Sequence, residues 1–397
     1  MFPSYTQSRT QIAIVGAGPA GLMLSHLLAQ AGIDSVAVDV RARREIEETH
    51  RAGILEQGSV DLLVDTGVSD RVHRDGYRHD GIELAFGGGG HRIDFQGLVG
   101  ASTQLYPQTD VFADLADARR RDGGDVRFGV TDVSVGDLTT DVPVLRFTDA
   151  DGIGHQIRAD FLVGADGSRS LCRQQVPADE RRQYFREYPF AWFGVLAEAP
   201  PSAPELIYNH SPRGFALISQ RTETLQRMYF QCDPAENVDD WSEDRIWAEL
   251  QARVGANGYH LNEGPIIAKT VLPFRSFVQE PMHHGRLVLA GDAAHTVPPT
   301  GAKGLNLALA DVRVLAEELQ RALAADDITP LATYSERALD RIWKAQHFSY
   351  WMTTMLHTLP DATAFDVRRQ EGELVALTSS IAGSTYLAEA YTGWPQW

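Results

Sequence analysis

Three glycines near the amino terminus have the spacing that phosphate binding requires. Gly16, Gly18 and Gly21 form a Gly-x-Gly-x-x-Gly pattern. The first glycine of such a pattern permits a tight turn, the second lets the backbone approach a pyrophosphate, and the third allows a helix to pack closely on a strand. Asp39 follows at a separation where a carboxylate accepts hydrogen bonds from a ribose. The pattern predicts a dinucleotide site rather than an ordinary glycine turn, and it leaves FAD and NAD undecided.

A second group of residues could hold a carboxylate. Ser219 and Arg221 are two residues apart, so on a strand they share a face. Tyr229 lies in a segment that would return as the partner strand. A guanidinium, a hydroxyl and a phenol together suit an anionic oxygen pair, because the arginine fork binds a carboxylate with two charge-assisted hydrogen bonds. The alternative is a surface arginine paired with a nearby acid such as Glu223.

The segments that must position these groups follow recognisable periods. A short apolar run, a helical run and a second short strand surround the glycines, which predicts one right-handed βαβ unit. Expected strands are 11–15, 35–39, 81–86, 144–147, 156–158, 161–164 and 286–290, with an antiparallel sheet over 206–231. A long helix is expected from about 303 to 325, and the rest of the chain has a mostly helical pattern with aromatic residues typical of a core or a dimer interface.

Bulk properties exclude several classes of protein. A chain of 397 residues exceeds one ordinary core, so we expect two or three structural units. A formal net charge of −17 offers no electrostatic reason to bind nucleic acid or anionic membranes. Two distant cysteines argue against a disulfide framework, and we expect no metal site. The amino terminus is polar and no run approaches the ~20 apolar residues of a membrane span, so we expect a cytoplasmic protein.

Two later motifs identify a family. The segments 162–167 and 289–295 resemble the second and third motifs of the flavoprotein aromatic hydroxylases, and the similarity extends from about residue 10 to Tyr391. Further similar segments are 51–57, 205–208, 212–217, 219–221 and 298–306. The resemblance implies FAD as the cofactor, with Asp292 on the flavin ribityl chain and the Asp166–Gly167 turn serving FAD and the nicotinamide cofactor. The implied FAD-binding residues are Gly16, Gly18, Ala20, Gly21, Asp39, Arg51, Gln57, Gln108, Asp166, Gly167, Gly291, Asp292, Pro299, Leu305 and Asn306.

The resemblance also implies a reaction. The members of the family that these segments resemble hydroxylate 4-hydroxybenzoate to 3,4-dihydroxybenzoate with O₂ and NAD(P)H. Their oxygen donor is a flavin C4a-hydroperoxide, which requires an electron-rich substrate ring. Deprotonating the substrate phenol makes the ring electron-rich, and Tyr208, Tyr391 and His79 match the family's proton relay. Tyrosine, with an ordinary pKa of ~10, would conduct the proton, and histidine, at ~6.5, would exchange it with water. Without the resemblance, His79 would be a surface histidine and Tyr391 a packing residue.

The same resemblance assigns the remaining contacts of the substrate. Ser219, Arg221 and Tyr229 would bind its carboxylate, while Tyr208 and Pro299 would face its phenol. Pro299 would supply a backbone carbonyl, and Thr300 would lie over the flavin edge. The alternative for the prolines at 298 and 299 is a rigid turn before a helix.

The segment after Asp39 departs from the family pattern. Relatives that use NADPH carry an arginine and a tyrosine where this chain has Val40 and Glu45. The acids at 45, 47 and 48 would repel a 2′-phosphate, and the arginines at 41, 43 and 44 could offset that repulsion. We therefore expect NADH to be preferred over NADPH. The residues expected to contact the nicotinamide cofactor are Arg41, Arg44, Arg169 and Arg275.

The expected architecture is α/β. A Rossmann-like FAD-binding domain of the glutathione-reductase type should cover 1–182, with part of the substrate sheet near 80–107. An inserted, mainly antiparallel substrate domain should cover 183–276, and 277–397 should complete the FAD site and form a helical interface region of a homodimer. Three alternatives stay open: a monooxygenase of another para-substituted aromatic acid, an FAD oxidase or dehydrogenase that inserts no oxygen, and a flavin-binding module without activity.

Overall fold

A mostly parallel sheet forms the centre of the larger part of the molecule. The computed structural model describes residues 5–49 and 53–394. The strand order of this six-stranded sheet is β19-β20-β13-β2-β3-β9, and only β19 runs antiparallel to its neighbour. Its strands are β2 (Ile12–Val15), β3 (Ser35–Asp39), β9 (Asp125–Phe128), β13 (Phe161–Gly164), β19 (His283–His284) and β20 (Leu287–Leu289). Such a sheet, covered by helices, is buried on both faces, which explains the uninterrupted apolar runs of β2 and β13.

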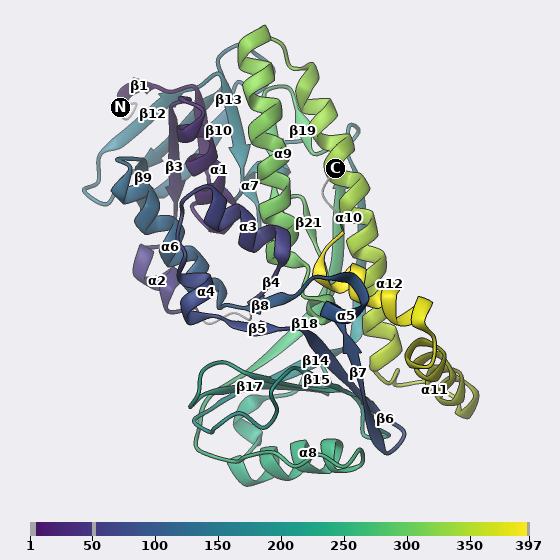
Figure 1. Ribbon diagram of the computed structural model, residues 1–397. Helices are drawn as coiled ribbons and strands as arrows, with labels where there is room; N and C mark the ends of the chain where they lie inside the picture. Colours follow the sequence, from purple (N-terminus) through teal and green to yellow (C-terminus); the bar gives the residue numbers. More distant parts are fainter. Residues whose placement is uncertain (1–4, 50–52, 395–397) are drawn as a thin grey trace.

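Helices pack against this sheet and against each other. The predicted βαβ unit is confirmed: α1 (Pro19–Gln30) connects β2 to the parallel strand β3. The helix begins three residues earlier than its apolar run because Pro19 occupies its first turn, where a missing N–H costs nothing. Helix α1 contacts α6 (Gln108–Arg121) and α9 (Gly304–Ala325), and α9 lies along α10 (Thr329–Leu356), as Figure 1 shows.

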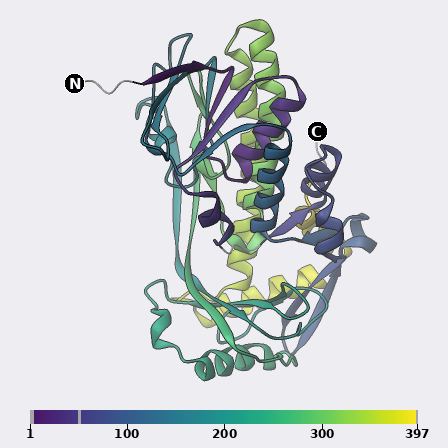
Figure 2. The ribbon, with the colours of Figure 1, turned by 90° about the vertical axis from the view of Figure 1, so that its left-hand side faces the viewer.

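An eight-stranded sheet forms most of the lower part of Figure 1. Its order is β21-β18-β14-β17-β16-β15-β6-β7, and all neighbours are antiparallel except β15 and β6. The strands are β6 (Gly81–Phe86), β7 (Gly89–Asp94), β14 (Arg182–Ala197), β15 (Ile207–Asn209), β16 (Ala216–Gln220), β17 (Gln226–Cys232), β18 (Ile266–Glu280) and β21 (His295–Thr296). Within the segment near 80–107, β6 and β7 thus join the later strands, whereas β8 (Thr103–Leu105) lies in another sheet. The two long strands β14 and β18 descend from the upper part of the molecule to this sheet (Figure 2).

Two smaller sheets complete the strands. In one, the predicted hairpin of β11 (Val144–Thr148) and β12 (Gly154–Arg158) is confirmed, flanked by β10 (Thr131–Gly136) and by β1 (Thr6–Arg9). The other contains β4 (Ile54–Glu56), β8 (Thr103–Leu105) and β5 (Tyr77–His79) in that order.

The carboxyl-terminal region is helical, as the pattern predicts. Helix α10 is followed by α11 (Ala364–Thr378) and α12 (Ile381–Thr392). A second apolar core joins α10, α11 and α12 to one face of the eight-stranded sheet, while α8 (Glu243–Gly255) covers the other face. Shorter helical segments are α2 (Arg43–Glu47), α3 (Gln57–Asp65), α4 (Arg71–Asp75), α5 (Phe95–Val99), α7 (Leu171–Gln174), η1 (Val238–Asp240), η2 (Gly291–Ala293) and η3 (Pro299–Gly301). Within the described ranges, none of the helices combines the length and apolarity needed to traverse a bilayer.

Candidate active site

The glycine turn after β2 has the geometry of a phosphate cradle. Gly16 has a φ of +105°, and a Cβ atom there would lie 2.2 Å from the carbonyl oxygen of Ala165. A Cβ atom on Gly21 would lie 1.9 Å from the carbonyl oxygen of Gly16. A Cβ atom on Gly18 would meet nothing within 4 Å. The second glycine therefore faces open space at the amino terminus of α1, where backbone N–H groups and the helix dipole favour a pyrophosphate. The turn fits FAD.

The acid at the end of β3 is held ready for hydrogen bonds to a ribose. The carboxylate of Asp39 is buried and accepts from the backbone N–H groups of Ala17 at 3.0 Å and Arg41 at 2.9 Å. Both bonds fix its oxygens and leave lone pairs for sugar hydroxyls. The Arg41 guanidinium lies 3.3 Å from both carboxylate oxygens of Asp39, so the Arg41 side chain points back toward the carboxylate expected to bind the ribose.

Two further turns meet at the same edge of the parallel sheet. Because β13 and β20 run parallel to β2, the Asp166–Gly167 and Gly291–Asp292 turns follow the same carboxyl edge as the glycine cradle. The Asp166 carboxylate accepts from the backbone N–H groups of Leu171 at 2.7 Å and Cys172 at 3.1 Å, which places it at the start of α7. Its side chain thus stabilises the turn, and the left-handed backbone of Gly167 keeps that turn tight.

A buried ion pair braces the Gly291–Asp292 turn from below. Asp311 of α9 accepts from the backbone N–H of Gly291 at 2.9 Å and from Nε2 of His295 at 2.6 Å. The neighbouring carboxylate raises the pKa of His295, outweighing the burial that lowers it. Asp292 itself is half-buried on the turn. Sequence reasoning missed this pair, and its only signal was an acid within the apolar run of α9.

The residues after the two prolines hold the start of α9 against β4. The Asn306 side chain donates to the carbonyl of Ile54 at 2.9 Å and accepts from the N–H of Glu56 at 2.9 Å. This side chain was expected to contact the cofactor, but its amide nitrogen also donates to the carbonyl of Ala302 at 2.9 Å, so its polar atoms are engaged within the protein, and the cofactor contact stays a prediction. Leu305 is half-buried on the same turn.

A buried cation that sequence reasoning did not single out lies beside this turn. Nζ of Lys303 is 2.6 Å from Oε1 of Glu56 and donates to the carbonyl of Tyr391 at 3.1 Å. Arg341 of α10 is 3.3 Å from the other oxygen of Glu56. Burial lowers the pKa of Lys303, and the Glu56 carboxylate opposes that effect. The pair fixes α12, and with it Tyr391, to the start of α9.

Two buried tyrosines form a direct hydrogen bond. The hydroxyl oxygens of Tyr208 on β15 and Tyr391 on α12 are 2.7 Å apart, and the Tyr208 hydroxyl is 3.3 Å from the carbonyl oxygen of Thr300. Burial raises the pKa of both phenols, so both stay protonated and can only pass a proton along. The carbonyl beside the phenols is that of Thr300, whereas the Pro299 carbonyl accepts from the N–H of Ala302 at 2.9 Å. The Thr300 hydroxyl lies 2.9 Å from that of Thr353.

His79 has a different environment from the one expected. It is 1% exposed on β5, and its Nε2 atom lies 2.7 Å from Nε2 of Gln220. Burial lowers its pKa to about 4. The alternative of a surface histidine is therefore wrong, because the ring is buried against Gln220 of β16. Among hydrogen bonds between described residues, none joins His79 to either tyrosine, and its part in a relay stays a prediction.

The expected carboxylate clamp lies at the ends of β16 and β17. Ser219 pairs with Arg227 in the ladder, and its hydroxyl donates to the Arg227 carbonyl at 2.8 Å. Nε of Arg227 donates to the Tyr229 hydroxyl at 3.0 Å, a contact that sequence reasoning missed although the two residues share a strand face. Arg221 follows β16, and burial together with Arg227 lowers its pKa. Ser219 and Tyr229 are buried beside these two cations, so the structure brings the polar groups of the clamp to one place.

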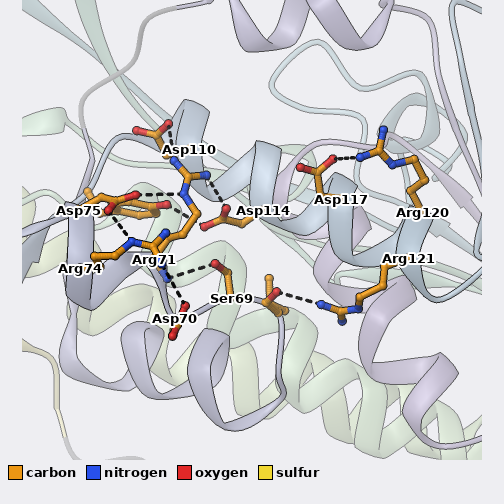
Figure 3. Close-up of polar contacts among 12 residues, drawn as sticks. Ser69, Asp70, Arg71, Arg74, Asp75, Asp110, Asp114, Asp117, Arg120 and Arg121 are labelled. Atoms are coloured by element: carbon orange, nitrogen blue, oxygen red, sulfur yellow. Dashed lines mark hydrogen bonds and ion pairs between the residues drawn. The ribbon is translucent and has the colours of Figure 1, made fainter.

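Gln57 and Gln108, two residues expected to contact FAD, are each the first residue of a helix. Gln57 opens α3 and donates to Asp61 at 2.7 Å, while Gln108 opens α6. An arginine on α4 anchors α6, as Figure 3 shows: Arg71 is 2.7 Å from Asp114 and 3.7 Å from Asp110. Arg51 lies outside the described residues.

The four arginines expected to contact the nicotinamide cofactor divide into two pairs. Arg41 contacts Asp39, and Arg44 is highly exposed and bonds Glu48 at 2.6 Å. Arg169 and Arg275 are exposed near the Asp166–Gly167 turn. Arg275 lines a pocket of about 230 Å³, whose other walls are Ser168, Arg173, Gln183, Phe185, Phe277 and Thr296.

Comparisons with known proteins place the chain in a family. The family model described as FAD binding domain matches residues 9–349. The chain belongs to the FAD-dependent aromatic hydroxylases, which are flavin monooxygenases.

Particular relatives refine this placement. The p-hydroxybenzoate hydroxylase of Acinetobacter baylyi is 44% identical over 389 residues, which cover 98% of this chain and 96% of that protein. A probable NADH-specific resorcinol 4-hydroxylase of Rhodococcus jostii is 24% identical over 84% of this chain and 63% of its own length. Among solved structures, p-nitrophenol 4-monooxygenase of Pseudomonas putida has a TM-score of 0.81 at 18% identity, covering 98% of this chain and all of that one, and shows the shared fold.

Proposed function

We propose that this enzyme hydroxylates 4-hydroxybenzoate to 3,4-dihydroxybenzoate, using O₂, bound FAD and a nicotinamide cofactor. The hydrogen bond between Tyr208 and Tyr391, beside the carbonyl of Thr300, is the observation that carries the proposal. A phenol that must lose its proton in a buried site needs a chain of groups that can relay it. The high identity to a p-hydroxybenzoate hydroxylase over nearly the whole chain supports the same substrate.

We propose the following division of roles along the chain. The amino-terminal part, 1–182, and the segment after 277 would hold FAD, and the sheet within 183–276 would hold the substrate. Bound FAD, once reduced by the nicotinamide cofactor, would react with O₂ and supply the electrophilic oxygen atom. Asp39, the glycine cradle and the Asp292 turn would bind it, consistent with the open space over Gly18.

The side chains of the substrate site would perform two tasks. Arg221, Ser219 and Tyr229 would bind the carboxylate, since a desolvated guanidinium contributes ~1.5–3 kcal/mol to such a contact. Tyr208 would accept the proton of the substrate phenol and pass its own proton to Tyr391. Loss of this proton makes the aromatic ring of the substrate electron-rich. The buried apolar surroundings keep bulk water out and strengthen both interactions.

We propose NADH as the preferred reductant. Each arginine of the segment after Asp39 is occupied by an acid: Arg41 by Asp39, and Arg44 by Glu48. Arg43 bonds both Glu47 at 2.8 Å and Asp117 at 2.7 Å. The positive charges that could have bound a 2′-phosphate are thus neutralised within the protein. The pocket beside Arg275 would receive the coenzyme.

A homodimer in the cytoplasm completes the proposal. Apolar side chains on the last two helices are strongly exposed: Phe365 by 74% on α11 and Ile381 by 81% on α12. Such side chains gain free energy when a second copy covers them. Light scattering of the purified protein would give the mass of the assembly.

Product analysis tests the function. Purified, FAD-loaded protein is incubated with 4-hydroxybenzoate, O₂ and NADH, and products are separated by chromatography. We expect 3,4-dihydroxybenzoate in proportion to NADH consumed. Hydrogen peroxide without hydroxylated product would instead support an oxidase. Turnover with another para-substituted benzoate but not with this one would move the assignment to a related monooxygenase.

A further inference from the structure

The contact between His79 and Gln220 joins the two halves of the molecule. His79 lies on β5 of the three-stranded sheet, and Gln220 is the last residue of β16 in the eight-stranded sheet. Both are buried, at 1% and 7% exposure. Side chains alternate along a strand, so Gln220 points away from the face that carries Ser219. One strand therefore holds the carboxylate clamp on one face and His79 on the other.

The orientation of the Gln220 amide follows from its second partner. Its Nε2 atom lies 3.0 Å from the carbonyl oxygen of Pro204 and 2.7 Å from Nε2 of His79. A carbonyl oxygen only accepts, so the NH₂ group must face Pro204, because a flipped amide would set two oxygens against each other. The remaining hydrogen of that NH₂ group points to His79.

This orientation determines the tautomer of His79. Because Gln220 donates to Nε2, that ring atom must be unprotonated, and the proton of the neutral ring resides on Nδ1. A protonated ring would oppose its own N–H to the amide N–H. Nearby charges do not remove this constraint: Glu205 is bound to Arg92 at 2.7 Å, and Asp80 to Arg78 at 2.7 Å.

Two buried polar atoms beside the ring have unused bonding capacity. Within the described part of the chain, Oε1 of Gln220 and the hydroxyl of Thr103 have no hydrogen-bond partner. Thr103 is paired with His79 in the ladder between β5 and β8. A flip of the Gln220 amide would bring its oxygen to Nε2 of His79, where it could accept a hydrogen from a protonated ring at the cost of the Pro204 bond.

We propose that Gln220 is a positioning residue for proton release: its amide holds His79 neutral with the proton on Nδ1, and an amide flip admits the protonated ring. The inference rests on the proposed function, because His79 has a proton to carry only if the substrate phenol is ionised in the site. It links substrate docking on β16 to the departure of the proton.

Nitrogen NMR of the FAD-loaded enzyme, labelled at histidine, tests the tautomer. The signals of His79 are assigned from the spectrum of a His79→Asn variant. We expect the Nδ1-protonated form in the native enzyme and a doubly protonated ring near neutral pH in Gln220→Glu, whose carboxylate accepts from Nε2. Gln220→Leu, which should pack well, is expected to raise the pKa of His79 by about one pH unit. A native ring protonated on Nε2, or a ring that responds to neither variant, overturns the proposal.

A matched control separates local from general effects. Gln251 of α8 also donates to a backbone carbonyl, that of Leu261 at 2.9 Å, and lies in the same half of the molecule. Gln251→Glu should leave the His79 signals unchanged. If this variant shifts them as Gln220→Glu does, the effect is not due to the amide at 220, and the proposal is wrong.

The kinetic test follows the ionisation of bound 4-hydroxybenzoate by its ultraviolet absorbance after a jump in pH. Gln220→Leu should slow this step roughly tenfold while substrate affinity stays unchanged, because the clamp lies on the other face. Unchanged ionisation in Gln220→Leu rejects the positioning role even if product forms normally. Absence of hydroxylated product with the native protein rejects the proposed function instead, so the two failures are distinguishable.

Discussion

The hydroxyl oxygens of Tyr208 and Tyr391 lie 2.7 Å apart, although 183 residues separate them in the chain. The contact requires that β15 and α12 meet, and the salt bridge between Lys303 and Glu56 holds α12 in place through the Tyr391 carbonyl. A proton can cross between two phenols only over such a short distance. The relay therefore depends on the packing of the carboxyl-terminal helices.

Replacing Tyr391 with phenylalanine should separate binding from chemistry. The variant keeps the ring that packs against Phe95 but loses the hydroxyl that forms the hydrogen bond with Tyr208. We expect the rate of hydroxylation to fall by roughly 10²-fold, the lower range for loss of a proton-transfer group, with little change in substrate affinity. Stopped-flow measurement of product formation checks this. Tyr188→Phe, which removes a buried hydroxyl bound to Ser276 outside the relay, should leave the rate near normal.

Removing the guanidinium of Arg221 should weaken binding of the substrate. Burial and the neighbouring Arg227 lower the pKa of Arg221, and a desolvated guanidinium of this kind would bind an incoming carboxylate strongly. Arg221→Ala should raise the dissociation constant of 4-hydroxybenzoate by roughly 10- to 100-fold. Titration monitored by flavin fluorescence gives this constant. The exposed Arg213, bound to Glu249, provides the control substitution, and an unchanged affinity in Arg221→Ala would remove this residue from the clamp.

The two glycines at the start of the cradle should respond differently to alanine. At Gly18 a methyl group meets no protein atom, so Gly18→Ala should fold normally and lose affinity for FAD. At Gly16 a methyl group would contact the Ala165 carbonyl at 2.2 Å in a left-handed backbone, so Gly16→Ala should lose roughly 1–3 kcal/mol of stability or more. Urea unfolding of the FAD-free proteins and FAD titration measure the two effects. Equal behaviour of both variants would contradict the cradle.

The preference for NADH should be visible in steady-state kinetics. We expect a higher kcat/KM with NADH than with NADPH, because the segment after Asp39 carries Glu45, Glu47 and Glu48, whose negative charges would repel a 2′-phosphate bound there. A tenfold or greater advantage for NADPH (~1.4 kcal/mol) rejects the prediction. Changing Val40 to arginine and Glu45 to tyrosine together should improve use of NADPH.

Stability should fall in acid partly through His357. Its Nε2 accepts from the indole of Trp192 at 2.7 Å, and burial lowers the pKa of His357 to about 3. In the unfolded chain this histidine has its ordinary pKa of ~6.5 and is protonated below that pH, whereas in the folded protein it stays neutral. The free energy of unfolding therefore falls as pH drops below ~6.5. The loss from this group approaches about 1.4 kcal/mol per pH unit.

Urea unfolding between about pH 7 and pH 4 measures that dependence. His357→Gln, which keeps an acceptor for Trp192, should flatten the curve by the contribution of one histidine. His260, exposed after α8, offers the control substitution to glutamine. A curve in His357→Gln that matches the native curve would show that another group dominates.

Local features of this protein were determined by its sequence alone. The roles of Gly16, Gly18 and Gly21 depend on backbone conformation within one βαβ unit, so their spacing was sufficient to predict the cradle. The strands of the hairpin at 144–158 and the long helix α9 follow from periodicity for the same reason. The placement of Ser219 and Tyr229 on neighbouring strands required only a short turn between them.

The tertiary structure decided everything that needs partners distant in the chain. Sequence could nominate Tyr208, Tyr391 and His79 only by resemblance, since nothing local indicates which side chains will meet. Burial of His79 beneath Gln220, 141 residues away, reverses the expected exposure and lowers its pKa. The Lys303–Glu56 pair spans 247 residues. Desolvation and hydrogen bonding depend on which surfaces pack together, and that is a property of the folded chain as a whole.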